Sequence, residues 1–190
     1  ATQDKDSEAS VDGDLTRWVP WLEAQGRREG GWSREELAAL DLMAVLLEPG
    51  LWSLPAVEAH QRWERLRVAI DQFGVERVPR REEVADRCED FGDVLDPDFD
   101  VPCQYGVESV EAYQMSIRLG RSSTYLMYKL GLGLEQRLGR YEDAEAAYRK
   151  ALELDPEYAR AHCGLGDLLE FHFGRYEDAE AAYRKALELD

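Results

Sequence analysis

Hydrophobic residues in the C-terminal part of the sequence recur every three or four positions. Within 139–155 they stand at Ala144, Ala147, Tyr148, Ala151, Leu152 and Leu154. This spacing aligns them along one face of a helix, and Pro156 ends that helix because proline cannot continue its hydrogen bonds. The segment 157–173 has the same spacing, and Gly174 separates it from the next run. The pattern predicts pairs of helices joined by tight turns.

One stretch of this pattern, GRYEDAEAAYRKALELD, occurs twice without a change, at 139–155 and at 174–190. The copies start 35 residues apart, and a period of roughly 20–50 residues is typical of stacked repeat units. One further period back, 107–120 matches more weakly, as a second helix whose first helix is missing or rebuilt. We therefore expect a degenerate half unit at 107–120, followed by units at 121–155 and 156–190.

Small and aromatic residues recur at fixed places in both units. They are Leu130, Gly131, Ala144, Tyr148, Ala151 and Pro156 in one unit, and Leu165, Gly166, Ala179, Tyr183 and Ala186 in the next. This arrangement resembles the tetratricopeptide repeat family over about residues 107–190. Each unit is one residue longer than is usual there, and the extra residue falls between the helices. The resemblance implies a solenoid of antiparallel helix hairpins, each covering the apolar flank of its neighbour.

The N-terminal half is also predicted to be helical, so the fold class expected is all-α. The helices indicated by hydrophobic spacing cover 16–25, 33–47, 56–73 and 80–91. Ser33 and Glu36 form a capping box at the start of the second helix. Pro55 suits the first turn of the third helix, and Gly74 ends it. We expect a helical N-terminal domain at 15–91 that precedes the solenoid.

All five tryptophans lie in this half, at positions 18, 21, 32, 52 and 63. An aromatic cage for a ligand is one interpretation of such a group. The interpretation favoured by their large apolar area is the core of a small helical domain. We recognise no family in this half of the sequence.

Two acidic segments border the predicted N-terminal domain. Residues 1–14 hold few aliphatic side chains and are expected to form a flexible acidic tail. Residues 92–106 favour no helix, and we expect an acidic loop or linker there. The aspartates of DPDFD in this segment are spaced as at the start of a calcium loop, but Val101 replaces the glycine that such a loop needs. The favoured interpretation is a solvated acidic turn.

Charge and cysteine content narrow the range of partners and compartments. The formal net charge is −17 over 190 residues, which repels nucleic-acid phosphates and anionic lipids, so we expect neither nucleic acid nor membrane. A protein partner with basic residues fits this charge, although acidity also serves solubility. Cys88, Cys103 and Cys163 fit no metal motif. Free thiols in a reducing cytoplasm are favoured over a bridge between the first two, so we expect a cytoplasmic protein.

The sequence lacks the common motifs of catalysis and cofactor binding. We find no nucleophile elbow, no zinc-protease pair of histidines and no phosphate-binding glycine loop. The three histidines have no clustered ligands around them in the sequence. We therefore expect no enzyme activity, no cofactor and no metal.

The resemblance implies that the chain is a binding scaffold. In the family, the first helix of each unit lines a concave groove that holds a peptide or a partner helix. Carried over by position, the groove residues are Tyr125, Tyr128, Leu132, Glu135, Gln136, Arg160, Cys163, Asp167, Glu170 and Phe171. Aromatic and aliphatic side chains beside acids suit a segment with apolar and basic residues. In the alternative interpretation, several of these residues pack against the N-terminal half.

Two further functions stay open beside the interaction scaffold or adapter. No helix in the sequence covers the apolar face of 176–189, so we expect part of a longer repeat array or a face covered by another molecule. If unlike repeat ends stack, the chain self-assembles head to tail. In the other alternative, the chain is a regulatory or sensor segment of a larger signalling protein.

Overall fold

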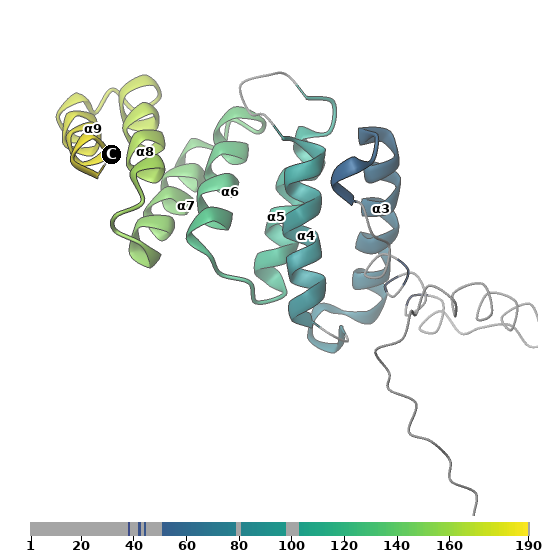
Figure 1. Cartoon of the computed structure of the whole chain (residues 1–190). Coiled ribbons are helices and arrows are strands. Elements are labelled where there is room, and N and C mark those ends of the chain that lie inside the picture. Colours follow the sequence, from purple (N-terminus) through teal and green to yellow (C-terminus); the bar gives the residue numbers. More distant parts are fainter. Residues whose placement is uncertain are drawn as a thin grey trace, which may run out of the picture.

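The computed structural model describes residues 51–78, 81–97 and 103–189, together with Ala38, Leu42 and Ala44. Within these residues the chain forms α-helices and short 3-10 turns, and no strand. The helices follow one another in a single row from α3 to α9 (Figure 1). The all-α fold predicted from the sequence is confirmed.

Several expectations for the N-terminal half lie outside the described residues. They concern the tail at 1–14, the helix at 16–25, the capping box of Ser33 and Glu36, and three of the tryptophans (Trp18, Trp21 and Trp32). Of the helix expected at 33–47, Ala38, Leu42 and Ala44 are described. All three are helical and buried.

The first fully described helix is α3 (Ala56–Phe73), which has the bounds that the sequence predicts. A 3-10 turn, η2 (Leu51–Ser53), precedes it, and Pro55 stands at its N-cap. Gly74 ends the helix with φ of 74°, a left-handed conformation that costs glycine little. A second short 3-10 turn, η3 (Val75–Arg77), then leads toward the next helix.

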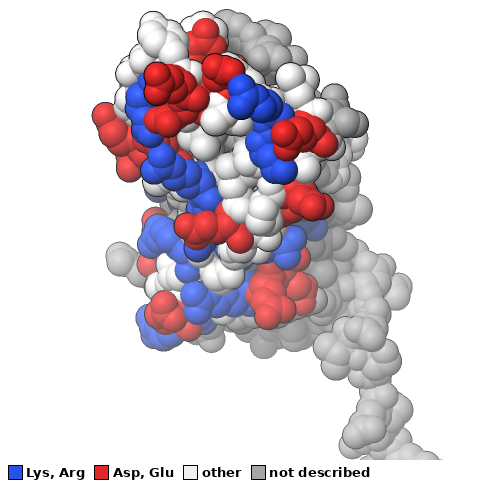
Figure 2. Space-filling view, turned by 90° about the vertical axis from the view of Figure 1, so that its left-hand side faces the viewer, with Lys and Arg blue, Asp and Glu red and all other residues white. Residues whose placement is uncertain are grey.

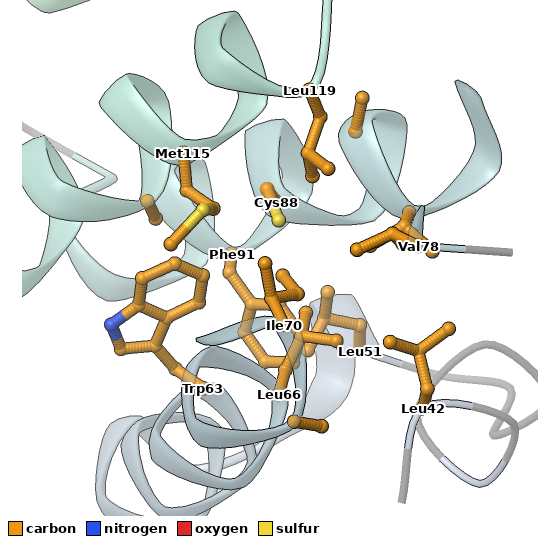
Figure 3. Packing of buried hydrophobic residues seen from close by; sticks show 14 of the residues in the cluster. Leu42, Leu51, Trp63, Leu66, Ile70, Val78, Cys88, Phe91, Met115 and Leu119 are labelled. Carbon is orange, nitrogen blue, oxygen red and sulfur yellow. The ribbon is translucent and has the colours of Figure 1, made fainter. Parts of the chain in front are cut away.

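A single hydrophobic cluster joins α3 to the two helices that follow, α4 (Arg81–Leu95) and α5 (Gly106–Arg118). Trp63 of α3 is fully buried, and its ring centroid lies 6.1 Å from that of Phe91 in α4. Met115 and Leu119 of α5 close the same cluster from the other side (Figure 3). The core interpretation of the tryptophans therefore holds for Trp63, whereas Trp52 is 64% exposed.

The repeat segment folds into four helices, α6 (Thr124–Gln136), α7 (Tyr141–Leu154), α8 (Ala159–Phe171) and α9 (Tyr176–Leu189). The side chain of Ser123 caps α6 by accepting a 3.0 Å hydrogen bond from the backbone N–H of Leu126. Gly139 and Gly174 both have φ of 62° in the turns within the two hairpins. These left-handed glycines reverse the chain, so the copies of the repeat start on equivalent turns.

Close contacts between a glycine and a tyrosine ring hold each hairpin together. A Cβ added to Gly131 would come within 2.6 Å of the Tyr148 ring, and one added to Gly166 within 2.6 Å of the Tyr183 ring. Gly92 of α4 lies in the same way against Tyr113 of α5, where an added Cβ would overlap the ring. Because the contact recurs, α4 takes the place of the first helix that the half unit at 107–120 lacked in the sequence.

The first aspartates of the acidic segment 92–106 do not lie in the solvated turn that the sequence suggested. Helix α4 continues to Leu95, four residues into this segment, and Asp96 is fully buried. Its carboxylate accepts hydrogen bonds of 2.6 and 2.9 Å from the guanidinium of Arg137 at the end of α6. Asp93 accepts a 2.7 Å hydrogen bond from Tyr113 Oη and lies 3.3 Å from Lys129 Nζ. For Asp93 and Asp96 the solvated-turn interpretation is wrong because these carboxylates pair with groups on later helices, and Asp98 and Asp100 lie outside the described residues.

Candidate functional site

A cavity of about 540 Å³ opens between α6, α8 and α9. Its walls consist of Tyr128, Ala159, Arg160, Cys163, Gly164, Asp167, Tyr183, Ala186 and Leu187. The small residues of α8 and α9 make room for the cavity, and longer side chains at its rim provide polar and charged groups. Three helices of two successive hairpins therefore build one concave site, which the fold creates only when the hairpins are stacked.

Helix α8 supplies the polar residues of this cavity. Arg160, Cys163 and Asp167 lie three and four positions apart, so they project from one face over two turns. All three side chains are exposed. The arginine and the aspartate are separated by about 10 Å along the helix axis, given the rise of about 1.5 Å per residue. The cavity thus carries a positive group at one end and a negative group at the other.

Aromatic rings form the apolar wall on the α6 side. The ring centroid of Tyr128 lies 5.5 Å from that of Tyr158 in an edge-on arrangement and 6.2 Å from that of Tyr148. Edge-on and tilted pairs of this kind are favourable and restrict the rings. Tyr128 is therefore held in place before any ligand binds, and it offers the cavity a rigid apolar surface.

Tyr183 of α9 connects this wall to the acids of α8. Its hydroxyl lies 2.7 Å from Asp167 Oδ1 and 3.0 Å from Glu170 Oε2. Burial and the two carboxylates raise the pKa of Tyr183 above its usual value. The hydroxyl therefore stays protonated and donates to the acids, which fixes their position at the rim of the cavity.

The ten residues that the sequence assigned to a groove do not all gather in this cavity. Tyr128, Arg160, Cys163 and Asp167 line it. Glu170 lines a neighbouring hollow on the outer side of α9, and Phe171 is 72% exposed away from both.

The other four, on α6, have different surroundings. Tyr125 lies with its hydroxyl 3.1 Å from both carboxylate oxygens of Asp93. Leu132 packs into the hydrophobic clusters between hairpins, Glu135 lies among the helices, and Gln136 is exposed. For Tyr125, the alternative interpretation that such residues pack toward the N-terminal half describes the structure better, whereas Leu132 packs within the repeat region itself.

Glu135 is the most enclosed acid among the predicted groove residues. Its carboxylate accepts a 2.8 Å hydrogen bond from Tyr148 Oη and lies 3.5 Å from His172 Nε2. Burial raises the pKa of Glu135, while the tyrosine and the histidine act in the opposite direction. Its contacts join α6, α7 and α8, so it serves the packing of the hairpins.

Sequence reasoning missed the contribution of α9 to the cavity. It assigned the groove to first helices only, whereas Tyr183, Ala186 and Leu187 come from a second helix. The available signal was the identity of the two repeat copies, because a residue that is partly buried in one copy, Leu152, is 79% exposed in the other as Leu187.

Metal-holding groups and membrane-spanning helices are both absent from the described part of the chain. Within it, no three His, Cys, Asp or Glu side chains lie close enough together to hold a metal ion. No helix there is both long and apolar enough to cross a membrane. Cys88, Cys103 and Cys163 form no disulfide bond, and Cys88 is fully buried. The sequence favoured free thiols, and the structure agrees.

Comparison with known families supports the interpretation of the hairpins. The tetratricopeptide repeat family matches residues 134–190, which contain α7, α8, α9 and the end of α6. This match coincides with the Gly–Tyr hairpins and with the doubled sequence. Residues 134–190 belong to the tetratricopeptide repeat family. Proteins of this family are non-catalytic interaction scaffolds, so the match supports a role in protein–protein interaction.

Solved structures similar to this chain include several of MamA. MamA of AMB-1 aligns with a TM-score of 0.56 and 21% identity, covering 94% of this chain and 84% of that one. A mutant of MamA aligns with a TM-score of 0.54 and 20% identity, covering 94% and 89%. MamA from Desulfovibrio magneticus RS-1 aligns with a TM-score of 0.50 and 17% identity, covering 93% and 86%. A comparison with curated proteins gave no match. At this identity the likeness shows the fold, a solenoid of helix hairpins.

Proposed function

We propose that the chain is an interaction scaffold whose tetratricopeptide repeats bind a segment of a partner protein in the cavity between α6, α8 and α9. The observation that carries the proposal is the cavity of about 540 Å³, with apolar walls and with Asp167 and Arg160 at its two ends. A hollow of this volume accepts one or two large side chains of a bound peptide or helix. The remaining repeats act as the frame that holds the three helices in place.

The chemistry of the walls indicates what the partner segment carries. Tyr128 and Leu187 offer apolar surface, which favours an aliphatic or aromatic anchor. Asp167 stands at the rim, and Glu170 lies beside it through their shared contact with Tyr183. A lysine or arginine next to the anchor would pair with these acids. The net charge of −17 also speeds the approach of a basic segment.

Arg160 gives the bound segment a direction. It lies two helical turns before Asp167 on the same face of α8. A segment with its basic residue near the aspartate therefore places a carboxylate or a free backbone carbonyl near the arginine. A partner with these charges reversed would meet like charges at both ends, which disfavours binding.

Two matched synthetic peptides test this proposal. One carries leucines at helical spacing with lysines beside them, and the other has glutamate in place of every lysine. We expect the basic peptide to bind at least about tenfold more tightly, measured by fluorescence anisotropy at low and moderate salt. Equal binding of both peptides, or none, would rule out this cavity as a binding site.

Two variants locate the binding within the cavity. Cys163→Trp places a large ring in the hollow from an exposed position and is expected to abolish binding of the basic peptide. Asp167→Lys is expected to weaken it by about tenfold through charge reversal. Glu177→Lys makes the same charge change on an exposed residue outside the cavity and serves as the matched control. Circular dichroism checks that all three variants keep their helical content.

A further inference from the structure

Helices α7 and α9 have the same sequence but different surroundings. In α7 the side chain of Glu145 is 16% exposed and Leu152 is partly buried in the core. In α9 the equivalent Glu180 is 71% exposed, and Leu187 is 79% exposed. The difference arises because α8 lies on the outer face of α7, whereas no described helix lies on that face of α9. The structure therefore shows one surface twice, once covered and once open.

Three contacts show how α8 and the turn after it recognise this surface on α7. The ring of His172 stacks on Tyr141 at 3.9 Å between centroids. Gly164 lets the ring of Tyr148 approach so closely that an added Cβ would lie 3.0 Å from Cε1. Arg175 Nη1 lies 2.9 Å from Glu145 Oε1. A small residue, a flat ring and a guanidinium thus meet an ordered row of side chains on α7.

The same row stands on α9 as Tyr176, Glu180, Tyr183 and Leu187. With neighbours from α8 and α9, these residues line a shallow hollow of about 420 Å³. Figure 2 faces this end of the molecule and shows uncharged surface running between groups of charged side chains. Tyr176 is 69% exposed, so the ring that would stack on a partner is accessible.

We propose that this face of α9 binds a helix of a partner protein that has the chemistry of residues 156–175. Such a helix carries a small residue, and the turn after it carries an imidazole or aromatic ring eight positions and an arginine eleven positions after the small residue, as Gly164, His172 and Arg175 do. Because Glu180 is negatively charged, the partner needs the positive charge of its arginine to pair with it. A second copy of the chain does not offer this helix, because its own α8 is packed between α7 and α9.

This surface is distinct from the cavity of the proposed function, although Tyr183 and Leu187 border both. Tyr176 and Glu180 border the outer hollow alone, whereas Cys163 and Asp167 border the cavity alone. Variants at these two pairs therefore separate the sites. If binding in the cavity is lost, binding on the outer face of α9 can still be measured, and the reverse holds as well.

A labelled synthetic peptide of residues 156–175 is the probe, titrated against the full chain by fluorescence anisotropy. We expect saturable binding that Glu180→Arg weakens by about five- to tenfold and Tyr176→Ala by a similar factor. A peptide with Arg175→Glu is expected to bind the wild type weakly and to regain affinity for the Glu180→Arg protein. Glu177→Arg, an equal charge change outside the hollow, is the control that leaves affinity unchanged.

Two further measurements decide between this partner and other occupants. A peptide with Gly164→Leu is expected to lose binding, since its side chain keeps the helix away from the Tyr183 ring. Light scattering gives the mass of the chain alone and of Leu187→Glu, an exposed and therefore tolerated change. Absence of peptide binding overturns the proposal, as does a dimer that Leu187→Glu converts to monomer, since a second copy then occupies the face. Failure of the charge exchange to restore affinity overturns it as well.

Discussion

The hairpins α4–α5 and α8–α9 reach the same packing from different sequences. In both, a glycine of the first helix lies under a tyrosine ring of the second: Gly92 under Tyr113, and Gly166 under Tyr183. In both, the aspartate after that glycine accepts a 2.7 Å hydrogen bond from the tyrosine hydroxyl. The tyrosine follows the glycine by 21 positions in the first hairpin and by 17 in the second. A repeat unit is therefore defined here by one close contact, and the connection between its helices can vary in length.

The two ends of the molecule differ in what joins one hairpin to the next. The α4–α5 hairpin is joined to α6 by the ion pair of Asp96, fully buried, with Arg137, 13% exposed. The α6–α7 hairpin is joined to the next one by apolar packing and by the pair of Glu145 with Arg175, whose side chain is 43% exposed. Buried charges tolerate little change once paired, whereas exposed pairs contribute little. The comparison predicts that the first joint is the more sensitive to mutation.

The largest effect is expected from removing the buried carboxylate of the first joint. Asp96→Ala takes the bidentate acceptor away from a largely buried guanidinium and is expected to lower the free energy of unfolding by about 3–5 kcal/mol. The matched change in the second joint, Arg175→Ala, is expected to have a much smaller effect, because solvent screens this exposed pair. Urea denaturation followed by circular dichroism measures both. Equal losses would show that the two joints do not differ as described.

A methyl group placed at the glycine contact compares the hairpins directly. Gly92→Ala forces the fully buried ring of Tyr113 to move and is expected to cost about 1–3 kcal/mol. Gly166→Ala meets Tyr183, which is only partly buried and can shift, so its cost is offset by the better helix propensity of alanine, worth about 1 kcal/mol. Thermal melts of both variants show which of the two substitutions destabilises the protein more. A larger loss for Gly166→Ala would contradict this prediction.

Removing the tyrosine hydroxyl isolates the hydrogen bond within each hairpin. Tyr113→Phe removes a buried donor to Asp93 and is expected to cost about 1 kcal/mol. Tyr183→Phe removes a donor to acids at the surface, where water replaces it, and is expected to cost about half as much or less. Chemical denaturation resolves the difference if both variants are measured against wild type in parallel. Equal costs would mean that burial of the bond does not matter.

The smallest effect concerns the pH dependence of the α6–α7 hairpin. Burial raises the pKa of Glu135 above its value in the unfolded chain, so the folded protein holds this proton more tightly. Wild type therefore loses stability relative to Glu135→Gln as pH rises from below the unfolded pKa of about 4.5 through the folded pKa. The free energy of unfolding, measured from acid to neutral pH, should rise for the variant relative to wild type. The opposite trend would mean that pairing with Tyr148 and His172 outweighs burial.

Much of the fold follows from the sequence because its signals are local. Hydrophobic spacing predicted every described helix from α3 to α9, and Pro55, Gly74 and Gly174 stand at their predicted boundaries. The doubled stretch predicted two hairpins with one geometry. The candidate site could be predicted only in part, since four of ten expected residues line the cavity. Position within a repeat predicts which helix faces the groove, but not which neighbours also reach it.

The sequence by itself determined the helices, the turns and the repeat, because each depends on residues a few positions apart. The tertiary structure alone decided that α4 pairs with α5, that Asp96 is buried against Arg137, and that α9 completes the cavity. These features join residues far apart in the sequence. A contact between distant residues produces no periodicity or local motif in the sequence from which it could be predicted. The two copies of the repeat show this most directly. Tyr148 of α7 is buried and Leu152 partly buried, whereas their counterparts Tyr183 and Leu187 in α9 are partly buried and exposed, because burial depends on the helix that packs against them.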